Sequence, residues 1–213
     1  ADDLSKINAL TTIAVDLTNV TSITSSSFDD LETLATAIGN SEFSNTTGFT
    51  TITVSDAAVD ATVLAATIDT YDSINGSGTT LIELSGGATI NVDAEEVVDM
   101  LLDERENRLN ITDQNIVVTG SLSVDDANVL SATTTGTVTA SITTTETVDS
   151  LLNLEGTHAY TIVISSADAT ATASDLNMLN PKTTVNIDAS AITELSGTYA
   201  EVTTLYGSAG VDN

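Results

Sequence analysis

The sequence TVTASITTTETVDSLLNL, residues 137–154, places a short strand pattern directly before a short helix pattern. Apolar or small side chains occupy every second position from Val138 to Ile142, and larger apolar side chains recur at helical spacing from Val148 to Leu154. This stretch therefore predicts a strand followed by a helix of one or two turns.

The same order of strand and helix returns twice further along the chain. YTIVI (160–164) precedes TATASDLNML (170–179), and TVNID (184–188) precedes YAEVTTLYG (199–207). Strand starts near 137, 160 and 184 are separated by about two dozen residues, the size of one unit in a stacked repeat protein. Strands alternating with helical crossovers predict an α/β fold, a right-handed solenoid of strand–helix repeats with a parallel sheet. A parallel β-helix is the alternative, favoured by the Thr and Gly content.

Residues 1–213 are expected to form a single elongated repeat array, because each module needs its neighbours to bury its apolar face. Helices are expected over 28–38, over 55–74 with Ser55 or Asp56 as cap, and from Asp93, which forms a capping box with Glu96. Modules are expected to start near residues 13, 51, 79, 116, 137, 160 and 184.

The two ends of the sequence align with each other. Residues 3–23 match residues 175–195 without a gap at an offset of 172, with seven identities, and after a one-residue shift 26–34 matches 197–205. Phe28 and Tyr199 occupy matching places and are predicted to lie in the core at helix starts. The chain is therefore expected to be one long period of a larger tandem array plus an overlap.

Charge and cysteine content exclude several classes of protein. The chain carries 31 Asp and Glu against four Lys and Arg, a formal charge of −27, and has no cysteine. The four cations are scattered along the chain and cannot form a positive surface that contacts successive phosphate groups. Nucleic acid and anionic membranes are therefore not expected partners. Disulfides and thiolate metal sites are excluded, and no apolar run approaches the roughly 20 residues that span a bilayer. An extracellular, saline environment is expected, because counter-ions screen the self-repulsion.

No residues are assigned as catalytic or cofactor-binding, and metal ligands stay unassigned. His158, the only histidine, is predicted to lie in a surface loop. Glu104 precedes Arg108 by four residues, which predicts an exposed helical ion pair. Calcium is the strongest cofactor candidate, since Asp, Asn and carbonyl oxygens suit it, although SGGATINVD (85–93) and YDSINGSG (71–78) only bring acidic residues and glycine near one another.

Three phrases carry a resemblance to a protein family: ITVSDAAVDATVLA (52–65), LSVDDANVLSATTTGTVTASI (122–142) and ITELSGTYAEVTTLYGSAGV (192–211). They resemble repeats of giant acidic, cysteine-free surface or secreted proteins of cyanobacteria and other marine bacteria, similar to RTX adhesins. The coarse layout also looks like leucine-rich-repeat architecture, without its consensus. The family resemblance implies a structural, adhesive or cell-coat role, with calcium-assisted folding, but the calcium-binding nonapeptide is absent.

These observations predict a non-enzymatic structural segment of a large extracellular surface protein: an adhesin stalk, a spacer or an S-layer component. Its partners would be neighbouring repeats of the same chain or like molecules, and cell-surface glycans. The alternative is a polysaccharide-binding solenoid such as a phage fibre segment, which needs a groove of carboxylates and aromatic side chains along one sheet face.

Overall fold

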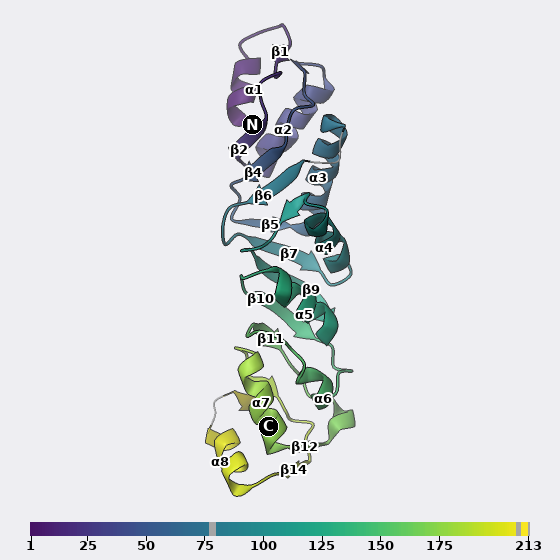
Figure 1. The fold of residues 1–213 in the computed structure, drawn as a ribbon, viewed down its shortest axis with the longest axis vertical. Helices are drawn as coiled ribbons and strands as arrows, with labels where there is room; N and C mark the ends of the chain where they lie inside the picture. The colour runs from purple at the N-terminus through teal and green to yellow at the C-terminus, as the bar shows by residue number, and fades with distance from the viewer. Residues whose placement is uncertain (77–79, 208–209, 213) are drawn as a thin grey trace. The chain divides into compact units, whose positions relative to one another are not determined.

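A computed structural model describes residues 1–76, 80–207 and 210–212 of the chain. The fold is mixed α/β, in which parallel strand pairs alternate with short helices (Figure 1). Because an α-helix lies in half of the connections between successive strands, these residues do not form an all-strand β-helix. Two compact units, Ala1–Gln114 and Asn115–Asn213, divide the chain.

The first unit is built around a four-stranded parallel sheet in the order β2-β4-β6-β8, with parallel pairs β1–β3 and β5–β7 beside it in the fold. The helices of this unit are α1 (Asp2–Asn8), α2 (Phe28–Gly39), α3 (Ala61–Asn75) and α4 (Val97–Arg105). Its strands are β1 (Val15–Asp16), β2 (Ser22–Ser26), β3 (Phe43–Ser44), β4 (Thr51–Val54), β5 (Ala58–Asp60), β6 (Leu81–Leu84), β7 (Thr89–Asp93) and β8 (Leu109–Asn110).

A single column of side chains forms the centre of this sheet. Ile23 pairs with Ile52, Ile52 with Ile82, and Ile82 with Leu109, and all four are at most 3% exposed. In-register parallel strands place equivalent side chains directly above one another. Val54 of β4 and Leu84 of β6 form a second buried pair. Each strand therefore contributes one or two residues to a core that it cannot form alone.

The second unit also combines parallel strands with short helices. Strands β9, β10 and β11 pair in parallel, as do β12 with β14 and β13 with β15. Its strands are β9 (Asn115–Leu122), β10 (Val138–Ile142), β11 (Ala159–Thr161), β12 (Thr170–Thr172), β13 (Ile187–Asp188), β14 (Glu194–Ser196) and β15 (Val211–Asp212). Its helices are α5 (Val124–Thr133), α6 (Val148–Leu151), α7 (Ala173–Leu179) and α8 (Tyr199–Gly207), with 3-10 turns η1 (Ser166–Asp168) and η2 (Asn180–Lys182).

Most of the predicted strands and helices are confirmed, and their boundaries are corrected in several places. The strand in TVTASI and the helix in YAEVTTLYG form as β10 and α8. In TATASDLNML the first three residues are strand β12, because Thr172 caps the helix and ends the extended segment. The predicted module start at residue 79 lies outside the described residues, and β6 begins at Leu81.

Two predicted helix starts are wrong for the same reason, which is that the preceding strand runs further than expected. β5 occupies Ala58–Asp60, so α3 begins at Ala61 with Asp60 as its cap, in place of Ser55 or Asp56. β7 extends to Asp93, so the Asp93–Glu96 capping box does not form and α4 begins at Val97.

The predicted alignment of the two ends agrees with the structure in element order and spacing. The elements α1, β1, β2 and α2 recur as α7, β13, β14 and α8. β1 and β13 start 172 residues apart, as do β2 and β14, and α2 and α8 start 171 residues apart. Asp16 accepts the backbone N–H of Thr18 after β1, as Asp188 accepts that of Ser190 after β13. We refer to 2–39 and 173–207 below as the first and second copies.

The free backbone N–H groups at helix N-termini are bound by acceptors from two sources. A Ser, Thr or Asp at the N-cap accepts a backbone N–H of the first turn in α2, α3, α5, α6 and α7. A carboxylate from the next module along the chain then accepts the first helical N–H in three of them. These bonds are Phe28 N to Asp56 Oδ2 (3.0 Å), Val124 N to Glu146 Oε1 (3.2 Å) and Val148 N to Asp168 Oδ2 (2.9 Å).

These cross-module caps should contribute measurably to stability. Asp168→Ala or Glu146→Ala removes one charge-assisted acceptor from a helix N-terminus, so we expect each to lower the free energy of unfolding by about 0.5–2 kcal/mol in urea titrations. The matched control is Glu95→Ala, which removes an exposed carboxylate outside these caps. Equal losses in all three variants would show that the caps do not matter.

Candidate functional site

His158 is the first candidate, and the structure places it in the core of the second unit, 8% exposed. The prediction of a surface-loop histidine is therefore wrong. His158 forms an isolated parallel bridge with Thr183 of the next module, and this neighbouring segment covers it. Its ring lies 5.4 Å from that of Tyr160, and Gly156, at φ +70°, leaves room for it: an added Cβ would be 2.9 Å from Nε2.

The hydrogen bonds of His158 argue against a Ser–His catalytic pair. Nδ1 accepts the backbone N–H of Val138 at 3.2 Å, which assigns the ring proton of the neutral imidazole to Nε2. Nε2 lies 3.0 Å from Ser131 Oγ and therefore donates to it. A general base must accept the proton of its nucleophile. In this arrangement the imidazole is the donor, and it joins α5 to two strands.

Burial lowers the pKa of His158 below its ordinary value. As pH falls, the unfolded chain therefore takes up the proton first, and protonation favours unfolding. The contribution of the neutral ring to stability is fully present above pH about 6.5 and is lost as pH falls towards the lower, folded-state pKa.

The pH dependence of stability tests this role. His158→Gln keeps one acceptor and one donor without a titrating group, so we expect the free energy of unfolding to fall less between pH 7.5 and 5.5 in the variant than in the unmodified protein. Parallel curves from urea titrations over that range would contradict a buried neutral histidine. The carboxylates titrate in both proteins and cancel in the comparison.

Arg108 is the second candidate, and its carboxylate partners differ from the prediction. Nη2 lies 2.5 Å from Asp103 Oδ1 and 3.1 Å from Glu106, while Nη1 lies 3.6 Å from Asp72 of α3. The predicted pair with Glu104 does not form, because α4 ends at Arg105 and helical spacing does not reach residue 108.

The guanidinium of Arg108 is a structural cation that joins α3 to the end of α4. The side chains of Asp72 and Asp103 are 13% exposed and that of Arg108 is 23% exposed. Burial raises the pKa of Asp103, and the positive charge of Arg108 opposes that shift. The acidic residues here are therefore neutralised from within the chain.

Removing this cation should destabilise the first unit. Arg108→Met leaves two largely buried carboxylates without their cation, so we expect a loss of about 2–3 kcal/mol in the free energy of unfolding, somewhat below that for fully buried pairs. Arg105→Met is the matched control, since Arg105 lies in the last turn of α4, three residues before Arg108. A loss in Arg108→Met no larger than in the control would contradict the structural role.

Metal binding receives no support from side-chain placement. Within the described part of the chain, no group of three or more His, Asp or Glu side chains is arranged to hold a metal ion. Of the two weak motifs, Ser85–Asp93 forms a glycine turn and β7, and YDSINGSG extends into residues outside the described ranges. Calcium binding stays a prediction from composition.

Carboxylates and aromatic side chains, as a polysaccharide site would need, meet in a pocket of about 630 Å³ between α2 and α3, whose lining includes Phe28, Asp29, Glu32 and Tyr71. That pocket lies between helices and not along a sheet face, and the Tyr71 hydroxyl donates to Leu31 O.

A pocket of about 310 Å³ contains Asp149, Asp168 and Asp175, and none of its lining residues is aromatic. Two of these carboxylates serve helix starts: Asp168 accepts from Val148 N, and Asp175 accepts from Thr172 Oγ1 at 2.7 Å.

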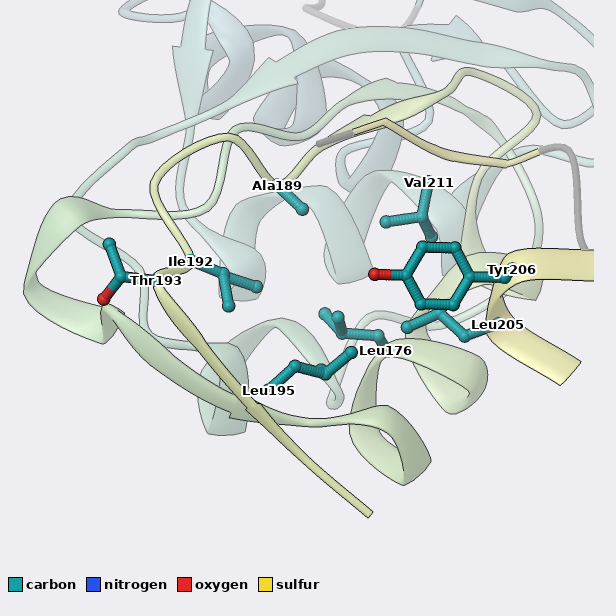
Figure 2. A pocket seen from close by; sticks show the side chains of 8 residues that line it. All are labelled: Leu176, Ala189, Ile192, Thr193, Leu195, Leu205, Tyr206 and Val211. Carbon is teal, nitrogen blue, oxygen red and sulfur yellow. The ribbon is translucent and has the colours of Figure 1, made fainter. Parts of the chain in front are cut away.

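A third pocket is apolar and lies beside α8. It has a volume of about 260 Å³, and Figure 2 shows its side chains around a hollow, with the hydroxyl end of Tyr206 pointing inward. Tyr199, at the start of the same helix, is 88% exposed and Tyr206 is 68% exposed, so the prediction of a core position for Tyr199 is wrong. The principal apolar lining residues are Leu176, Ile192, Leu195, Leu205, Tyr206 and Val211.

Comparisons with protein-family models, with curated proteins and with solved structures found no match to this chain. Among the described residues, no helix is both long and apolar enough to cross a membrane.

Proposed function

We propose that the chain is a non-enzymatic structural segment of a large extracellular surface protein, a stiff acidic spacer or adhesin stalk built as a solenoid of stacked strand–helix modules. The observation that carries this proposal is the recurrence of α1-β1-β2-α2 as α7-β13-β14-α8 at an offset of 171–172 residues. Recurrence of the same element order at nearly the same spacing is typical of tandem arrays, in which each unit contacts its neighbours.

Three features support a role in holding distance. The sheet core is built from equivalent side chains of successive strands, so a module can be added without redesigning the ones before it. The polar clusters around His158 and Arg108 link successive modules through hydrogen bonds and ion pairs. The net charge of −27 keeps such an array soluble and separated from like surfaces in salt water.

The proposed environment and partners follow from the same composition. Neighbouring modules would be the principal partners, with cell-surface glycans as the target if the array ends in an adhesive part. A cell coat or S-layer differs from a stalk only in lateral contacts. The family resemblance in the sequence phrases agrees with these roles.

Small-angle X-ray scattering tests the spacer proposal directly. A compact protein of this length has a radius of gyration of about 17 Å. We expect the monomer to give a value well above that, with an asymmetric pair-distance distribution that does not change between 0.15 and 1 M salt. A value near that of a compact sphere would contradict the proposal.

A further inference from the structure

In the second copy, β14 and α8 are less covered than their counterparts β2 and α2 in the first copy. Ile23 on β2 is 3% exposed, whereas its counterpart Leu195 on β14 is only half-buried. Leu31 on α2 is 1% exposed, whereas its counterpart Val202 on α8 is half-buried. Leu195 lines the apolar pocket of Figure 2, and Val202 packs against Ala173, Leu176 and Leu205 beside it.

A strand covers the edge of β2 in the first copy. β4 pairs in parallel with β2, placing Ile52 opposite Ile23. Two further backbone bonds fix the register, from Thr50 N to Thr21 O (2.8 Å) and from Ser55 N to Ser26 O (3.0 Å). In the second copy β14 pairs with β12, and among the described residues no strand pairs with its other edge.

A helix and a carboxylate complete the cover in the first copy. The Tyr71 hydroxyl of α3 donates to Leu31 O on α2 at 2.8 Å, and Asp56 Oδ2 accepts the N–H of Phe28 at 3.0 Å. The residues that match Leu31 and Phe28 in the second copy are Val202 and Tyr199. The exposed Tyr199 therefore marks the place where an equivalent carboxylate and helix would pack.

The strand pairing indicates how the cover would be supplied. β15 pairs with β13, Ile187 opposite Val211, as β3 pairs with β1, Val15 opposite Phe43. β15 thus holds the position of β3, the strand that directly precedes β4. A second molecule that stacked end to end on this one would place its first strand, β1, against β13. It could not do so, because β15 already occupies that edge of β13.

We propose that the apolar pocket beside α8 and the open edge of β14 form a docking site for one further tandem module of this repeat. The module enters as a parallel strand with the alternating pattern FTTITV of residues 49–54, and then adds a helix across α8. This inference rests on the proposed function, because it assigns the partner of a stacked array. The strand supplies backbone bonds to β14, and its alternate aliphatic side chains fill the pocket.

An extended chain tests the docking site. Residues 46–76 are copied and joined after Asn213, which matches Asn45 in sequence, so that the added strand follows β15 as β4 follows β3. We expect hydrogen exchange of the amides in β14 and α8 to slow at least tenfold relative to the original chain, because local opening must now break the added contacts. The matched control carries Ile52→Asp in the added copy only, and should return exchange to the original rate.

Each other outcome overturns the docking proposal. Unchanged exchange in the extended chain means that the pocket does not accept such a module. Equal slowing in the Ile52→Asp control means that the strand pattern is not recognised. Slowing in the original chain that grows with protein concentration means that a second molecule is the occupant. The scattering experiment uses the original chain, so an extended shape without docking would reject this inference and leave the spacer proposal standing.

Discussion

The constraint on which this structure depends is that none of its strands can stand alone. The strands are two to eight residues long, and the central ones contribute single side chains such as Ile52 to a column shared with Ile23 and Ile82. Short parallel strands bury their side chains only when a neighbour lies on each edge. Stability in such a fold is a sum of contacts between adjacent modules, which explains why Leu195 on β14 is more exposed than Ile23 on β2, whose strand has β4 beside it.

The acidic composition has a structural explanation in addition to solubility. Many of the carboxylates close helix N-termini, either within a module, as Asp126 does with Ser123, or across modules, as Glu146 and Asp168 do. A negative charge at these positions is stabilised by the partial positive charge of the helix start. The chain can therefore carry a large excess of acid while placing part of it where folding gains from it. Arg108 neutralises a further group of carboxylates between two helices.

The sequence predicted the α/β class, the alternation of strands and helices and the relation between the two ends, because these depend on local periodicity and on direct comparison. It did not predict which face of each element is covered. His158 was expected at the surface, since a loop histidine beside Gly156 carries no signal that Thr183, one module later, will pair with it. Phe28 and Tyr199 were both expected in the core because they occupy matching places in the two copies, but Phe28 is only half-buried and Tyr199 is 88% exposed. The prediction of an ion pair between Glu104 and Arg108 was wrong because it assumed that the helix continues to residue 108. The helix ends at Arg105, and charge spacing does not show where a helix ends.

The cross-module caps have a consequence for the order of folding during synthesis. Three capped helices, α2, α5 and α6, receive a second acceptor from a carboxylate 20 to 28 residues further on, so each is completed only after the next module has left the ribosome. At these three places a growing chain carries an unfinished helix at its leading end. Folding there would therefore advance in one direction, one module behind translation.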